Sequence, residues 1–304
     1  MKKTQNQNQK NNYLNIIALS GLFIGIVLCV YYSYVMITHA GHLSNEKIYN
    51  YVLNQIKNNF GDFLTGTVGV LFTLTATIFL FITFREQRKQ FDLTNKDQAQ
   101  SRFETTYFNL LAMLDDVRNN VNQNIKLNLV SENVSSIYDY YSLLKKHYEV
   151  YPVNSNKPEF VTLMSDLKSA TLPSQIEMAE GSMQDLFDSF VKKYNCNIGY
   201  YFRYIYNTIN FAIEERTDAG DVSRYLNILQ AQLSNEELAL IFYDALSSYG
   251  RNKNGTKKFK SILNTYQVLE NIDESYLLNR NHFRFYPKTQ FKFLTRSELA
   301  SIIN

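Results

Sequence analysis

Two long apolar runs dominate the N-terminal part of the chain. Residues 14–37 and residues 63–84 contain no charged side chain, and each run is long enough as a helix to cross a bilayer core of about 30 Å. A signal peptide is the alternative for the first run, but that run is long, lacks a small-residue cleavage site and is followed by a second. The pattern therefore predicts a hairpin of two transmembrane helices.

The charges around this hairpin predict its orientation. Basic residues flank the two runs on their outer ends, at Lys2, Lys3, Lys10, Arg85, Arg88 and Lys89, whereas the joining loop has only Lys47 and Lys57. Basic residues concentrate on the cytoplasmic side of a membrane. Both termini are therefore predicted to be cytoplasmic, with residues 1–13 as the N-terminus and residues 38–62 as an external loop.

Two weaker patterns accompany the hairpin. Apolar residues recur at helical spacing in residues 45–60 of the loop, which predicts a short amphipathic helix there. Small residues recur along the second run, at Gly66, Gly69, Thr73 and Thr77, and such a stripe lets another helix approach closely. We expect the stripe to pack against the first run, and homo-oligomerisation is the alternative.

A helix is predicted to continue beyond the second run. Residues 85–118 contain neither proline nor glycine, so residues 85–102 should form a helical stalk. From residue 103 onward apolar residues repeat at spacings of three and four, at Phe103, Tyr107, Leu110, Leu111, Leu114 and Val117. One face is therefore buried there, and residues 103–304 are expected to be a cytoplasmic helical domain.

The rest of this domain also reads as mainly α, because the chain has only 4 prolines and 11 glycines. We predict helices at residues 132–148, from about residue 174, and at 199–213, 234–249 and 259–272. Ser234 with Glu237 fits a capping box and Gly250 fits a helix C-cap. Around Pro287 aromatic and basic residues alternate, which predicts a small C-terminal hairpin.

The predicted helix at residues 199–213 is apolar around most of its circumference. Its narrow polar wedge consists of Arg203, Asn207, Asn210 and Glu214. A helix of this kind is normally buried, and a buried charge must be paired. We therefore expect Arg203 to form a buried ion pair with Glu104 or Glu237, and we favour a structural role for it over a catalytic one.

Familiar catalytic and metal-binding motifs are absent from the sequence. It contains no GxxxxGK[ST], GxGxxG, HExxH or GxSxG motif. Its 2 cysteines, Cys29 and Cys196, lie far apart, and the pair His39 and His42 has no third ligand nearby. We expect neither a cofactor nor a metal.

Two alternatives involve nucleic acid. A helical ribonuclease of the HEPN type would place a histidine four to six residues after its arginine, whereas Arg203 is followed by Asn207 and Asn210. A divergent ribonuclease would use Arg203 with Asn207 or His282. The basic segment 251–304, with its interleaved aromatics, could bind RNA or anionic lipid, although a structural domain edge is favoured.

Three segments together resemble a known family. They are "FETTYFNLL" at residues 103–111, "YYFRYIYNTINF" at 200–211 and "LQAQLSNEELALIFYDALS" at 229–247. In this order, behind a membrane hairpin, they are similar to the phage abortive infection proteins of the AbiC type. The resemblance implies a bacterial cell-membrane protein with two N-terminal spans, a helical cytoplasmic domain and a role in antiphage defence.

The positions that carry this resemblance are Phe103, Glu104, Phe108, Leu111, Tyr201, Phe202, Arg203, Tyr206, Gln232, Leu233, Ser234, Glu237 and Tyr243. The sequence departs from the family where Tyr200 replaces a histidine and Gln230 an arginine. Proton transfer at residue 200 is thereby disfavoured, because tyrosine titrates near pH 10. The candidate functional cluster is Arg203, Asn207, Asn210, Glu214, Glu104, Glu237 and Gln232.

These observations favour a membrane-anchored antiphage protein. Its cytoplasmic domain would sense infection, or a phage or host protein, and trigger growth arrest or membrane disruption. The lipid bilayer is its expected partner, and catalysis is not favoured. The alternatives are the divergent membrane-tethered ribonuclease and a non-enzymatic adaptor.

Overall fold

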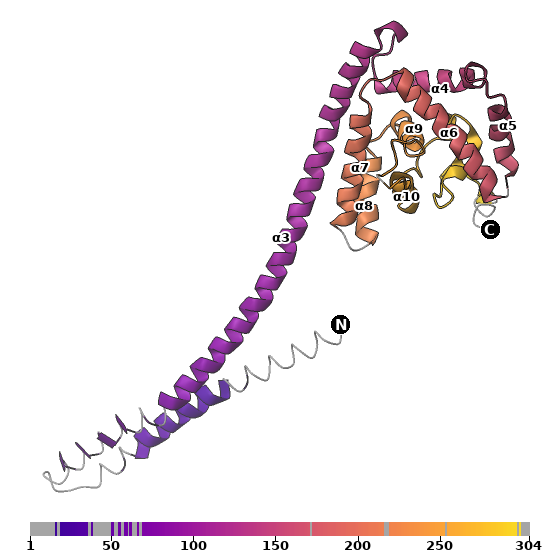
Figure 1. The fold of residues 1–304 in the computed structure, drawn as a ribbon. Helices are drawn as coiled ribbons and strands as arrows, with labels where there is room; N and C mark the ends of the chain where they lie inside the picture. Colours follow the sequence, from indigo (N-terminus) through magenta and orange to yellow (C-terminus); the bar gives the residue numbers. More distant parts are fainter. Residues whose placement is uncertain are drawn as a thin grey trace. The chain divides into compact units, whose positions relative to one another are not determined.

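The computed structural model describes residues 16, 19–35, 38, 50–51, 54–55, 58–59, 61–62, 66, 69–170, 172–215, 219–252, 254–296 and 298. The chain divides into two compact units, Met1–Ser101 and Arg102–Asn304. The described residues are mainly helical and contain no β-strand (Figure 1). The predicted mainly α fold class is thereby confirmed, whereas His39 and His42 lie outside the described residues.

The first unit contains two apolar helical segments. One is the helix Leu19–Val35, and the other is the first part of α3, which runs without interruption over Gly69–Asn128. The α3 helix is long and apolar enough to cross a membrane, and Leu19–Val35 is a shorter apolar helix. The helical stalk predicted at residues 85–102 is part of α3. Of the loop helix predicted within residues 45–60, residues 50–51, 54–55 and 58–59 are described, and all of them are helical.

These two segments approach each other at small residues. A Cβ atom placed on Gly21 would lie 3.1 Å from Oγ1 of Thr75, and one on Gly25 would lie 3.7 Å from the ring of Phe72. Thr75 is buried, whereas Thr73 and Thr77 are exposed. The expectation that the stripe with Thr73 and Thr77 packs against the first run is therefore wrong for these two residues, because the contact uses the neighbouring face of α3.

The second unit is built from short helices around a central one (Figure 1). After α3 come η2 (Val130–Glu132), α4 (Ile137–Asn154), α5 (Glu159–Asp166), η3 (Leu167–Ser169), α6 (Pro173–Lys193), α7 (Gly199–Glu214), α8 (Ala219–Gln230), α9 (Asn235–Asp244), α10 (Lys258–Thr265), η4 (Glu274–Tyr276) and η5 (Arg280–Phe285). Every residue of α9 from Glu237 to Asp244 is buried, and α9 contacts both α4 and α6. This short helix is the centre of the core.

Several predicted helix features are confirmed. On α3, Phe103, Tyr107, Leu111, Leu114 and Val117 are buried. The capping box at the start of α9 is present, because the Glu237 N–H donates to Oγ of Ser234 at 3.2 Å and the Ser234 N–H donates to Oε2 of Glu237 at 2.9 Å. Side-chain oxygens thus accept hydrogen bonds from the backbone N–H groups at the first turn of the central helix.

Other boundaries were wrong. The helix predicted at 234–249 ends at Asp244, so Gly250 is not its C-cap, and the helix predicted at 259–272 ends at Thr265. The helix predicted at 132–148 spans Ile137–Asn154, and α5 lies in the interval before residue 174, where no helix is predicted. The predicted C-cap is wrong because the apolar spacing typical of a helix continues in the sequence beyond Asp244. In the structure these later residues form turns that also pack against the core.

The predicted C-terminal hairpin is also wrong. The segment instead forms η5 and turns, in which His282, Phe283, Phe285 and Tyr286 are all buried. A strand with one exposed face would alternate buried and exposed residues, and this segment does not. The buried rings are therefore part of the core and do not form the stacking surface that RNA binding at this segment would need.

Candidate functional site

The predicted partners of Arg203 lie elsewhere. Glu237 is almost fully buried and binds Arg118 of α3, with 2.7 Å from Nε to Oε1 and 3.2 Å from Nη2 to Oε2. Glu104 accepts a hydrogen bond of 2.9 Å from the hydroxyl of Tyr225. Arg203 itself is exposed. The expectation of a buried Arg203 pair was wrong, because Arg203 lies on the edge of α7 that faces solvent.

The Arg118–Glu237 pair joins elements that are distant in sequence. Nη2 of Arg118 also donates to the backbone carbonyl of Gln232 at 3.0 Å. Tyr201 of α7 lies beside the pair, and its burial followed by the negative charge of Glu237 raises its pKa well above the ordinary value. The second and third family-like segments therefore meet at Glu237, with Arg118 in the place expected for Arg203.

The sequence does carry a signal for Arg118. It lies four residues after Leu114 and three before Val121, and both of these are buried. These spacings place all three side chains on one helix face. An arginine within an apolar stripe indicates a buried partner, so this signal would have pointed to Arg118 but not to Glu237.

Arg203 lies instead in the wall of a pocket, here called the Arg203 pocket, with a volume of about 420 Å³. Its wall comes from α7, the end of α9, the following loop and the start of α10. The lining residues are Gly199, Phe202, Arg203, Tyr206, Asn207, Asp244, Tyr249, Gly250, Arg251, Asn252, Lys258 and Phe259. A neighbouring groove of about 580 Å³ shares Gly199, Phe202, Arg203, Asp244 and Tyr249 with it.

The chain turns tightly where α9 ends at this pocket. A Cβ atom on Gly250 would lie 2.8 Å from both the carbonyl oxygen of Asp244 and Cα of Ala245. Only glycine allows the backbone to pass this close to the end of the helix. Oγ of Ser247 donates to the same Asp244 carbonyl at 2.6 Å. This turn brings Tyr249 and Arg251 to the pocket wall.

Ion pairs fix the opposite wall. The carboxylate of Glu180, on α6, is almost fully buried and binds Lys257 and Lys260, with 2.6 Å from Oε2 to Nζ of Lys260. These two lysines flank the pocket residues Lys258 and Phe259 in the sequence. The start of α10 is thereby held against α6. The ring of Phe259 meets that of Tyr206 edge-on at 5.4 Å, and Nζ of Lys258 lies 5.8 Å from the Tyr206 ring centroid.

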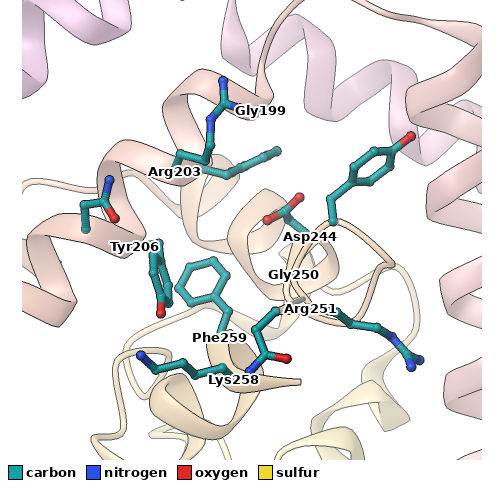
Figure 2. Close-up of a pocket in the computed structure, with 12 residues that line it drawn as sticks. Gly199, Arg203, Tyr206, Asp244, Gly250, Arg251, Lys258 and Phe259 are labelled. Carbon is teal, nitrogen blue, oxygen red and sulfur yellow. The ribbon is translucent and has the colours of Figure 1, made fainter. Parts of the chain in front are cut away.

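Asp244 is the acidic residue of the pocket wall. Figure 2 shows its carboxyl facing into the pocket between Arg203 and Phe259, while the guanidinium groups of Arg203 and Arg251 both point away from it. Arg251 instead binds the side chain of Gln184. Burial, and then the negative charge of Asp188, raises the pKa of Asp244 to about 8. At neutral pH the pocket therefore combines cationic side chains with a mainly uncharged carboxyl.

The remaining predicted residues do not join one cluster. Asn207 lies in the Arg203 pocket, whereas the amide of Asn210 donates to Glu214 at 2.6 Å one turn further along α7. Glu104 and Glu237 have the separate partners described above, and the side chain of Gln232 is exposed. The structure thus brings Arg203 and Asn207 together, and the functional role of all seven residues stays a prediction.

His282, proposed above to act with Arg203 in a ribonuclease, is enclosed in the core. Its Nδ1 lies 2.9 Å from the hydroxyl of Tyr243 and its Nε2 lies 3.3 Å from Sδ of Met164. Burial lowers its pKa to about 3. The ring is not among the residues that line the Arg203 pocket, so the geometry gives no support to a joint catalytic role.

Fold and sequence together define a mainly helical domain that follows an apolar helical N-terminal unit. Residues 193–277 of this domain match the family described as "Putative phage abortive infection protein". This match confirms the predicted family over these residues, which include the second and third segments and the whole lining of the Arg203 pocket. Neither curated proteins nor solved structures give a significant match.

Proposed function

We propose that the protein is a membrane-anchored antiphage protein that acts by abortive infection. The match of residues 193–277 to the abortive infection family carries this proposal. In it, the N-terminal unit inserts into the bacterial cell membrane as a two-helix hairpin with both termini cytoplasmic. The helical domain then senses infection from inside the cell and triggers growth arrest or membrane disruption.

The surface of the N-terminal unit supports membrane insertion. Large apolar side chains are exposed along both apolar segments, including Phe23, Ile24, Val70, Leu80 and Phe81. Exposing so many apolar groups to water is unfavourable, and lipid would cover them.

Its polar groups are also suited to lipid. The hydroxyls of Thr73, Thr75, Thr77 and Thr83 all donate to backbone carbonyls of their own helix, each at 2.8 Å. Hydrogen bonds inside a helix satisfy polar groups that lipid cannot.

Phage challenge tests the proposal. The full chain and a variant lacking residues 1–84 would be expressed at equal levels in a sensitive bacterial host. We expect the full chain to lower plating efficiency, and infected cells to die before releasing phage when all are infected. The truncated variant should lose protection, and an unrelated two-span hairpin fused before residue 85 should restore it.

The outcomes separate the alternatives. Full protection by the truncated variant would contradict the membrane role, and absence of protection against a broad phage panel would contradict the defence role. A partner crosslinked during infection without a growth phenotype would favour the adaptor. A voltage-sensitive dye then separates the two outputs, because membrane disruption predicts early loss of potential in infected cells and growth arrest does not.

A further inference from the structure

Asp244 is a buried residue whose carboxyl opens onto the Arg203 pocket. The residue is 5% exposed, and its carboxyl forms no hydrogen bond or ion pair with any residue in the described part of the chain. Its oxygen atoms are not fully enclosed by protein, so a molecule in the pocket could form the hydrogen bonds that the described residues do not. This carboxyl faces the Arg203 pocket (Figure 2), so a molecule bound in the pocket would contact it.

The charges of the pocket wall favour an anion. Arg203 is exposed on the first turn of α7 and forms no ion pair with a described residue. Lys258 contacts the ring of Tyr206 and forms no close ion pair with a described residue, although the charge of Glu214 acts on it. A guanidinium offers a planar set of donors that binds two phosphate oxygens at once. Arg203 is thus the natural phosphate contact, and Lys258 adds positive potential.

The rest of the wall suits a flat ring. Phe202 and Phe259 are almost fully buried, and Tyr206 is held edge-on to Phe259, so the aromatic surface is rigid. Pockets for small ligands usually span about 300–1,000 Å³ and combine apolar walls with a few polar groups. A volume of about 420 Å³ fits that range.

We propose that the Arg203 pocket binds a nucleotide. Arg203 contacts the phosphate, the aromatic residues contact the base, and Asp244 forms a hydrogen bond with the base edge or a ribose hydroxyl. The ligand thereby supplies the partner that the Asp244 carboxyl lacks. This binding site is independent of the membrane role and of the antiphage role proposed above.

Titration calorimetry on the detergent-purified full chain tests the site. The probes are ATP, GTP, CTP and UTP in magnesium-free buffer, then the nucleoside of the tightest binder, and inorganic phosphate. We expect saturable binding of at least one nucleotide at one site per chain, tighter than its nucleoside and tighter than phosphate. Arg203→Ala should weaken nucleotide binding about 10-fold to 100-fold, as expected when charge-assisted hydrogen bonds are lost, and leave nucleoside binding unchanged.

Two further variants make the test specific. Asp244→Leu, once its helix content by circular dichroism equals that of the unmodified chain, should weaken nucleoside and nucleotide binding by the same factor. Arg224→Ala removes an exposed arginine outside the pocket and should change nothing. The proposal is overturned if no nucleotide binds at about 1 mM, which is weak for a specific ligand. It is also overturned if Arg203→Ala and Arg224→Ala have the same effect on binding, or if single-stranded RNA binds far more tightly than any mononucleotide.

Discussion

The two acidic residues at opposite ends of α9 have similar burial and opposite surroundings. Glu237, in the first turn, is 1% exposed and binds Arg118 and the Ser234 N–H. Asp244, the last residue, is 5% exposed and faces a pocket with no partner in the described structure. The Glu237 carboxylate accepts hydrogen bonds on both oxygens, which compensates for its burial. A buried carboxyl without partners instead costs stability, and proteins keep such groups where they bind or react.

The largest expected effect is a pH dependence of stability that comes from Asp244. Its pKa is about 8 when folded and about 3.9 when unfolded. Between these values the folded chain keeps a proton that the unfolded chain loses, so stability falls as pH rises from about 4 to 8. The full shift corresponds to roughly 5–6 kcal/mol.

This contribution is measured as a difference between two chains. Urea unfolding of the unmodified chain and of Asp244→Asn, followed by tyrosine fluorescence, should be compared from pH 4 to pH 9. The unmodified chain should lose stability relative to the variant as pH rises. His282 acts in the opposite direction, since its folded pKa of about 3 lowers stability as pH falls below about 6.5, but it is present in both chains and cancels. A constant difference between the chains would show that Asp244 is ionised when folded.

The second prediction concerns the first turn of α9, here called the filled end because Glu237 has its partners there. Arg118→Ala leaves the Glu237 carboxylate buried without its cation, and removing one member of such a pair costs about 3 kcal/mol or more. Chemical denaturation at pH 7 measures this loss. Arg118→Ala combined with Glu237→Gln should recover a large part of it, because no uncompensated charge then remains. A loss below about 0.5 kcal/mol, the usual size for a surface substitution, would mean that water replaces Arg118.

The third prediction concerns the turn after Asp244, at the end of α9 that borders the Arg203 pocket, here called the open end. Gly250→Ala places a methyl group 2.8 Å from backbone atoms of Asp244 and Ala245. The turn must move, at a cost of about 1–3 kcal/mol. The matched control is Gly181→Ala in α6, where the added Cβ meets no atom within 4 Å. That substitution should stabilise the chain by about 0.5–1 kcal/mol, because alanine favours a helix over glycine. Equal melting temperatures for the two variants would contradict the tight turn.

The sequence predicts the filled end of α9 better than the open end. Ser234 and Glu237 form a local pattern, and local patterns depend on contacts only three residues apart, so the capping box was predicted correctly. The Arg118–Glu237 pair joins residues 119 positions apart, and no local rule links them. Only the position of Arg118 within an apolar stripe pointed to burial.

The Arg203 pocket depends on even more distant contacts. Its wall needs the turn at Gly250, and it needs Glu180 of α6 to hold Lys257 and Lys260 of the segment that starts α10. Asp244 lies within an apolar run, so its sequence context indicates burial and does not reveal a pocket. Arg203 was expected to be buried because the helix around it is apolar, yet a single exposed edge is enough to place an arginine at a pocket mouth.

The smallest expected effect on stability tests the comparison most directly. Arg203 is exposed and has no ion pair with a described residue, so Arg203→Ala should change the free energy of unfolding by no more than about 0.5 kcal/mol. Arg118→Ala measured alongside it should cost several times more. If Arg203→Ala instead destabilises the chain as strongly as Arg118→Ala, both arginines are structural. If stability is unchanged while nucleotide binding is lost, the open end of α9 is a ligand site, because the variant then loses an interaction that only a bound molecule can provide.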